Sequence, residues 1–102
     1  MKLYLISQDI NDDWDTYDSA VVVAENEVDA RSIHPSEYVT HIKNGKWMGT
    51  YHHNAMKNPG GEYENDNQGC WLPLSKVGSV KVKYLGETNL SRGVILASFN
   101  AG

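Results

Sequence analysis

Five consecutive apolar residues, AVVVA from Ala20 to Ala24, place the strongest constraint on how this chain can fold. Valine branches at Cβ and favours extended backbone, and an apolar run without alternating polar residues is typical of an interior strand covered on both faces. A second β-rich stretch, LYLIS from Leu3 to Ser7, precedes it. The sequence therefore predicts a β-sheet with the strand from Ala20 to Ala24 near its centre.

The later part of the chain contains three more strand signals. The dipeptide Asn44-Gly45 lies within YVTHIKNGKWMGTYHH and is the strongest short signal of a β-hairpin, because both turn positions need positive φ. The stretch VGSVKVKYLGE has apolar residues at alternate positions, Val80, Val82 and Tyr84, as a half-buried strand does. The stretch GVILASFNAG supplies another apolar strand.

One short helix is predicted between the second strand and the hairpin, in AENEVDARSIHP. Asn26 is a suitable N-cap, and Glu27 and Asp29 place negative charge in the first turn, where the helix dipole favours it. Pro35 disfavours helical geometry at His34 and should end the helix there. The side chains expected on its apolar stripe and beside it are Val28, Ala30, Arg31 and Ile33. A helix of two turns must pack on the sheet to be stable.

These elements predict an α+β fold, with a mostly antiparallel sheet of four to five strands and one short helix packed on one face. The 102 residues suit a single domain over positions 1–102. Positions 54–69 are rich in Asn, Gly, Glu and Asp and predict a long polar loop. The hairpin and this loop, at 36–69, are interpreted as an elaboration of the scaffold.

Charge and cysteine content exclude several classes of function. Nine Lys and Arg against thirteen Asp and Glu give a formal net charge of −4, which disfavours direct binding of nucleic acid or anionic membranes. No apolar stretch approaches the roughly 20 residues of a membrane-spanning helix, and the N-terminus does not match a signal peptide. The single cysteine, Cys70, fits a reducing compartment, so we expect a cytoplasmic protein.

The stretch QDINDDWDTYDSA, from Gln8 to Ala20, has five aspartates and is predicted to connect the first two strands. It fails as an EF-hand calcium loop. Asp9, Asn11 and Asp13 could occupy the first three ligand positions, but Trp14 stands where glycine is needed, and Ala20 stands where glutamate should close the site.

Three interpretations of this acidic stretch stay open. It is a solvated turn, since Asp and Asn side chains bond nearby backbone amides. Alternatively it is a looser cation site, formed by Asp12, Asp13, Asp15 and Asp18. In the third interpretation, Trp14 and Tyr17 anchor a protein partner while the neighbouring carboxylates steer the encounter.

Catalytic and zinc motifs are weak in this sequence. The four histidines, His34, His41, His52 and His53, and Cys70 lack the paired spacing of zinc sites. His52 and His53 are adjacent, so on a strand they would point to opposite faces. There is no G-x-S-x-G elbow, no G-x-G-x-x-G fingerprint and no Walker sequence. We expect no cofactor, no catalytic residue and no dedicated metal ligand.

Two parts of the chain resemble a family of small bacterial and phage proteins of uncharacterised function. The resemblance rests on YDSAVVVAE, on the short helix DARSIHP and on the terminal GVILASFNAG, and covers roughly the first third and last quarter of the chain. Positions 36–69 show no such similarity. The resemblance implies a cytoplasmic protein associated with mobile elements, and it brings no functional residues with it.

The favoured function is a non-catalytic protein-interaction module, of a phage or prophage accessory type, that binds or inhibits a host protein, with a host defence system as one target. Its partner-binding surface is predicted to consist of Asp12, Asp13, Trp14, Asp15 and Tyr17, or of the hairpin tip around Trp47. The alternative is a ligand-binding domain, or a small metal-dependent enzyme, that holds calcium or another divalent cation in the acidic loop at 9–18.

Overall fold

The computed structural model describes residues 1–10, 16–36, 39–49, 63–64 and 71–100. Within these residues the α+β class is confirmed, and two antiparallel sheets are present. The elements in chain order are β1 (Lys2–Ser7), β2 (Thr16–Ala24), α1 (Glu27–Arg31), β3 (Val39–Lys43), β4 (Lys46–Gly49), β5 (Tyr63–Glu64), the 3-10 helix η2 (Leu74–Ser79), β6 (Lys81–Glu87) and β7 (Gly93–Asn100).

The larger sheet has four strands in the order β6-β1-β2-β7, and every neighbouring pair is antiparallel. Strands β1 and β2 pair in a continuous register in which Tyr4 faces Val22 and Leu5 faces Val21. The valine-rich strand is therefore interior, as predicted. The prediction that both of its faces are covered is not fully met, because the side chain of Val21 is only half-buried.

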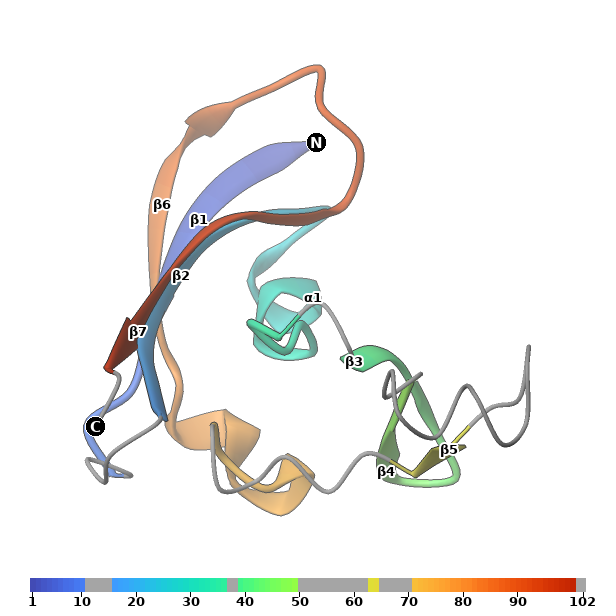
Figure 1. Ribbon diagram of the computed structural model, residues 1–102. Helices are drawn as coiled ribbons and strands as arrows, with labels where there is room; N and C mark the ends of the chain where they lie inside the picture. The colour runs from blue at the N-terminus through green and yellow to red at the C-terminus, as the bar shows by residue number, and fades with distance from the viewer. Residues whose placement is uncertain (11–15, 37–38, 50–62, 65–70, 101–102) are drawn as a thin grey trace.

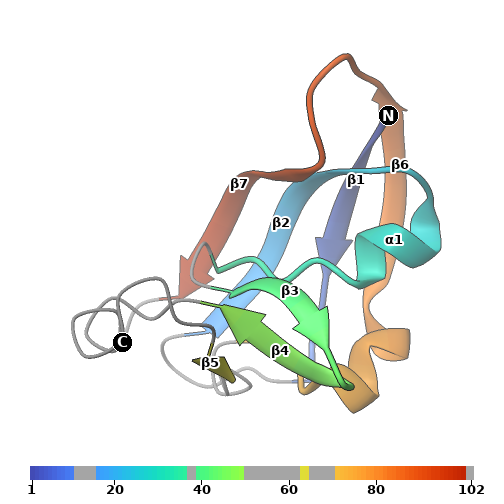
Figure 2. The same ribbon diagram turned by 90° about the vertical axis from the view of Figure 1, so that its right-hand side faces the viewer.

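The hydrophobic core lies on one face of the larger sheet. Tyr4, Ile6 and Val22 point into it from β1 and β2. Helix α1, η2 and the β3–β4 hairpin lie on this side of the sheet, and Figure 2 shows α1 and the hairpin in front of the four strands. The residues that these covering segments bury against the sheet are Ala30, Ile33, Val39, Trp47, Trp71, Leu72 and Val80.

Helix α1 begins as the sequence predicts and ends earlier. The Asn26 side chain accepts a hydrogen bond of 2.8 Å from the backbone N–H of Asp29, which satisfies a helix N-terminal donor. The last helical residue is Arg31, three residues before the predicted end. The predicted stripe also fails at Val28, which is 77% exposed, since a helix of five residues offers only one face to the sheet.

The β3–β4 hairpin turns at Asn44 and Gly45, as predicted. Both residues have positive φ, 53° and 73° respectively, which is the backbone geometry that a two-residue hairpin turn needs. Strand β5 pairs with β4 to complete a three-stranded sheet. The two residues of β5, Tyr63 and Glu64, belong to the stretch at 54–69 that is predicted as a polar loop. The other residues of that stretch lie outside the described residues.

The structure corrects the placement of Trp47 at an exposed hairpin tip. Its side chain is 5% exposed, and its indole Nε1 donates a hydrogen bond of 3.1 Å to the carbonyl of Leu72. Trp47 pairs with Ile42 across the hairpin, but it points into the core that the hairpin shares with the larger sheet. The tryptophan therefore anchors the hairpin and is not offered to solvent.

The connection between β6 and β7 passes over the end of the larger sheet at which the N-terminus lies (Figure 1). It joins the two outermost strands of the sheet through residues 88–92. The backbone N–H of Thr88 donates to the carbonyl of Met1, which ties the connection to β1. Arg92 then reaches helix α1 and pairs with Asp29 at 2.9 Å.

Candidate protein-binding surface

Four of the predicted partner-binding residues, Asp12, Asp13, Trp14 and Asp15, lie outside the described residues, so their role stays a prediction. The residues that flank them are held by local contacts. Gln8 donates from Nε2 to the carbonyl of Tyr17 at 2.9 Å and so joins the two sides of the connection.

Asp9, at the start of the acidic stretch, is engaged in an ion pair. Its carboxylate lies 2.9 Å from the Nζ of Lys81, and this charged hydrogen bond lowers the pKa of Asp9. Both side chains are largely exposed. At the other end of the stretch, Asp18 accepts a hydrogen bond of 3.3 Å from the hydroxyl of Ser19. The two described acids therefore bond to neighbouring strand residues.

Tyr17, the fifth residue of the predicted surface, packs against the core side of the sheet. Its ring lies 4.8 Å from that of Phe99 and 6.5 Å, edge on, from that of His34. The same imidazole lies 5.2 Å from Trp47 in a T-shaped contact. The structure thus brings Tyr17 and Trp47 to one aromatic cluster, but this cluster lies inside the molecule and Tyr17 is partly buried there.

His34 is the buried centre of this cluster, with 3% of its surface exposed. Its Nδ1 accepts a hydrogen bond of 2.9 Å from the backbone N–H of Ser36. An imidazole nitrogen that accepts has no proton, so the proton of the neutral ring is on Nε2. His34 therefore has a structural role here: it fixes the turn that follows α1 and packs against the rings of Tyr17, Trp47 and Trp71.

The face of the larger sheet that points away from α1 is apolar as well. Because side chains alternate along a strand, the residues directly before and after a core-facing residue point outward. In one row across the sheet, Lys83 faces Leu5, Leu5 faces Val21, and Val21 faces Leu96. The outer-face patch, as we call it, consists of Leu3, Leu5, Val21 and Leu96. Val23 is on the same face but is fully buried, at 0% exposure, and does not belong to the patch.

No described element covers this outer-face patch (Figure 1). Leu96 is 68% exposed, and Leu3, Leu5 and Val21 are half-buried by their neighbours in the sheet. An antiparallel sheet with one wet face normally places polar residues there. Aliphatic side chains in these positions are therefore unusual for a surface in contact only with water.

Polar side chains border the patch on two sides. The next row of the outer face contains Lys81, Ser7, Ser19 and Ser98. Lys83 lies at the β6 end of the apolar row and is exposed. An apolar centre with a polar rim is the arrangement found at protein-binding sites.

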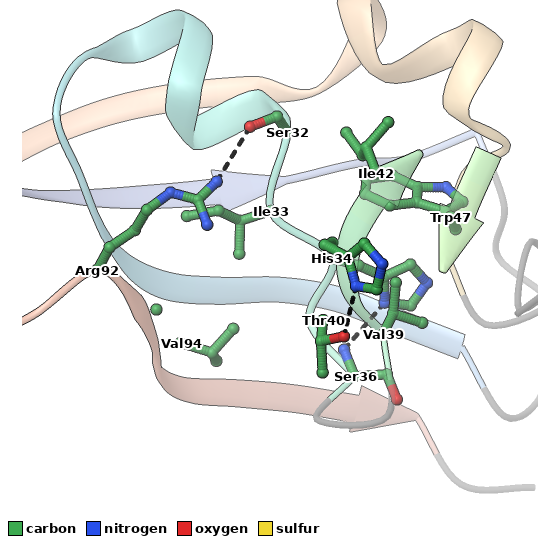
Figure 3. A pocket seen from close by; sticks show the side chains of 12 residues that line it. Ser32, Ile33, His34, Ser36, Val39, Thr40, Ile42, Trp47, Arg92 and Val94 are labelled. Carbon is green, nitrogen blue, oxygen red and sulfur yellow. Dashed lines mark hydrogen bonds between the residues drawn. The ribbon is translucent and has the colours of Figure 1, made fainter. Parts of the chain in front are cut away.

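A separate cleft lies on the core side, between the segment after α1, strand β3 and the start of β7 (Figure 3). Its volume is about 470 Å³, which is within the range of small-molecule sites. The guanidinium of Arg92 donates to the hydroxyl of Ser32 at one end, and the hydroxyl of Thr40 lies 2.8 Å from Nδ1 of His41 at the other. The cation in this cleft is already neutralised, because Arg92 pairs with Asp29.

Metal ligands do not gather among the described residues: no group of three or more His, Cys, Asp or Glu side chains there could hold an ion. His52, His53, Cys70 and most of the acidic stretch lie outside the described ranges. In the same described part of the chain, no helix is long and apolar enough to cross a membrane.

Comparison with known proteins finds no match: no family model matches the chain, and no curated protein or solved structure is significantly similar to it.

The outer-face patch was missed by the sequence interpretation, although its signal was present. Leu3 and Leu5 alternate with Tyr4 and Ile6, so β1 is apolar on both faces. Coverage on both faces is predicted only for the run from Ala20 to Ala24, whereas the stretch from Leu3 to Ser7 is predicted simply as a strand. A strand whose second face binds another protein has the same pattern as one covered on both faces by its own chain, and only the placement of the covering elements distinguishes the two.

Proposed function

We propose that this chain is a non-catalytic protein-binding module of the cytoplasm that uses the outer-face patch to bind its partner. The observation that supports this proposal is the aliphatic face formed by Leu5, Val21 and their neighbours, opposite the side packed by α1. Burial of such a face releases roughly 25 cal/mol for each Å² of apolar surface. Residues of the outer-face patch take the place of Trp47 as contacts, and the acidic loop is a second contact region.

The chemistry of the patch specifies the partner. Leu5, Val21 and Leu96 require an aliphatic or aromatic surface opposite them, while the exposed ammonium of Lys83 at the end of the same row favours a carboxylate. A partner of this kind is a folded protein and not a nucleic acid, since phosphates have no affinity for an aliphatic centre. Following the family resemblance, we propose that the partner is a bacterial host protein, which this chain would block as a phage or prophage accessory factor.

The experiment is affinity capture from a bacterial lysate with two outer-face variants and one control. Leu5→Gln changes the centre of the patch at nearly constant volume, and Lys83→Glu reverses the charge at its rim. Val28→Lys is the control, because Val28 is 77% exposed on α1 and lies away from the patch. Thermal melts of each variant verify that the fold is retained.

We expect a partner that wild type and Val28→Lys retain and that Leu5→Gln loses, with binding by Lys83→Glu weakened about tenfold or more. A partner retained equally by all four proteins would refute a role for the patch. Running Asp12, Asp13 and Asp15→Asn in parallel tests the acidic loop separately: loss of the partner only in that variant would place recognition in the loop.

The cleft of about 470 Å³ favours a second function, small-molecule binding. The ligand would contact Arg92 and Thr40 at the two ends of the cleft, and a divalent cation in the acidic loop belongs to the same alternative. Thermal melts in chelator and in added calcium, magnesium or zinc test the cation. Saturation at about a hundred times Kd raises stability by roughly 2.7 kcal/mol, and no change in Tm with any ion would remove the divalent cation from this alternative.

A further inference from the structure

We propose that two copies of this chain associate through their β7 strands, antiparallel across a two-fold axis, so that two four-stranded sheets form one continuous sheet. This self-association is distinct from the binding of a host partner proposed above. It uses the backbone edge of the sheet, whereas the proposed partner site lies on its outer face, and Leu96 is the residue that the two proposals share.

Strand β7 is the last strand in the order β6-β1-β2-β7. One side of its backbone pairs with β2, and the other side has no strand next to it among the described residues. The N–H and C=O groups along such an edge are available to pair with another strand. An edge of this kind recruits another chain unless charge, proline or a covering element prevents it.

The two edges of this sheet differ in charge. Strand β7, GVILASFN, contains no charged residue and no proline over its eight positions. Strand β6, KVKYLGE, contains Lys81, Lys83 and Glu87. Charged side chains, lysine above all, are the usual protection of an exposed edge, so β6 is protected in a way that β7 is not.

Side chains of β7 specify what can bind beside it. Leu96, on the outer face, is 68% exposed, and Phe99, next to Tyr17 on the core side, is 46% exposed. An incoming strand must therefore be uncharged and must present apolar groups on both of its faces. A second β7 meets both conditions, because antiparallel pairing about a two-fold axis places outer face beside outer face and core side beside core side.

Pairing of β7 with β6 of another copy is a poor alternative. It would place Lys81 and Lys83 along a strand that offers no opposite charge. It would also leave a free edge at each end of the pair and continue into an open fibre, whereas a two-fold contact closes after two chains. The charges of β6 therefore favour a closed dimer.

The regular part of β7 is long enough to pair. Ile95 has no partner in the register with β2, so the strand bulges there. From Leu96 to Phe99 each successive residue of β7 has a partner on β2, and the register shift between Tyr17 and Ser19 places its extra residue on β2 and not on β7. A pairing of this length buries less than the roughly 800 Å² per partner of a standard interface. The dimer should consequently dissociate on dilution.

Sedimentation equilibrium over a dilution series up to about 1 mM protein measures the association. This range detects a dimer with a dissociation constant of about 1 mM or less. We expect an average mass that rises with concentration from 11.4 kDa toward twice that value. Leu96→Lys and Phe99→Lys add charge to opposite faces of β7, and each should weaken association at least tenfold. Leu5→Gln and Val28→Lys should leave it unchanged, because neither residue is on β7.

A wild-type mass of 11.4 kDa at every concentration would overturn the proposal. It would also be overturned by a dimer that survives Leu96→Lys, or by one that Leu5→Gln abolishes, since the latter pairs through the outer face. Because Phe99 packs on Tyr17, a melt accompanies that variant, and Leu96→Lys decides the result if Phe99→Lys unfolds. Failure here leaves the host-partner proposal intact, because that proposal rests on capture by the outer-face patch.

Discussion

The guanidinium of Arg92 lies 2.9 Å from the carboxylate of Asp29, although 63 residues separate the two along the chain. The pair joins helix α1 to the connection that leads into β7. Asp29 also accepts from the backbone N–H of Glu25 at 3.0 Å and from the hydroxyl of Ser32. One carboxylate therefore holds the start of the helix, its end and the β6–β7 connection.

Replacement of Asp29 should reveal this role in the pH dependence of stability. Partial burial of Asp29 favours its neutral form, but Arg92 and the Glu25 amide outweigh burial, and the pKa is below its ordinary value of 3.8. A carboxyl whose pKa is lowered on folding contributes stability above its unfolded pKa and loses it as pH falls through the folded pKa. We expect Asp29→Asn to cost about 1 kcal/mol at neutral pH, and less below about pH 4.

Urea unfolding of wild type and Asp29→Asn at neutral and acid pH measures this difference. The control is Glu27→Gln, which removes the exposed ion pair between Glu27 and Arg31 and should cost less than about 0.5 kcal/mol. An unfolding free-energy difference for Asp29→Asn that does not shrink in acid would contradict the assigned role.

Trp47 should be the side chain of the hairpin that contributes most to stability. It is 5% exposed and donates to the carbonyl of Leu72. Trp47→Ala should cost about 3–5 kcal/mol, because it leaves a cavity. Trp47→Phe retains much of the packing and leaves the Leu72 carbonyl without this donor, at about 1–3 kcal/mol. Ile42→Ala, on the facing strand and 39% exposed, is the matched control. Equal losses for Trp47→Ala and Ile42→Ala would show that the tryptophan is not buried in solution.

Local signals in the sequence determined more of the fold than of the candidate site. Asn26 and the dipeptide Asn44-Gly45 act through backbone geometry within a few residues, so the helix start and the hairpin turn could be predicted. The side chain of Trp47 depends on where the hairpin packs, and no local pattern contains that information. Likewise Leu5 lies in a predicted strand, but whether its side chain points to the core or to the outer face follows from the positions of α1 and the hairpin.

Gly45 should be required for backbone reasons alone. Its φ is +73°, and a Cβ built there has no atom within 4 Å. Gly45→Ala therefore meets no clash and should cost about 1–2 kcal/mol, the penalty of the left-handed region for a residue with a side chain. Asn44→Gly is the converse change and should be close to neutral, since glycine tolerates the φ of 53° at that position. Thermal unfolding of both variants tests this assignment, which a larger loss for Asn44→Gly than for Gly45→Ala would contradict.

Gly93 should couple to the ion pair between Arg92 and Asp29, because it sets the direction of the chain directly after Arg92. Its φ is +149°, a value that residues with a side chain rarely adopt, and a Cβ there would have no atom within 4 Å. Gly93→Ala should therefore shift the backbone, at about 1–3 kcal/mol, and displace the guanidinium of Arg92. A double-mutant cycle of Gly93→Ala with Asp29→Asn should show a coupling of about 0.5 kcal/mol or more, since the second change removes an interaction already weakened by the first. Additive losses in unfolding free energy would mean that the two residues act separately, and that the start of β7 is positioned by its pairing with β2 and not by the contact with the helix.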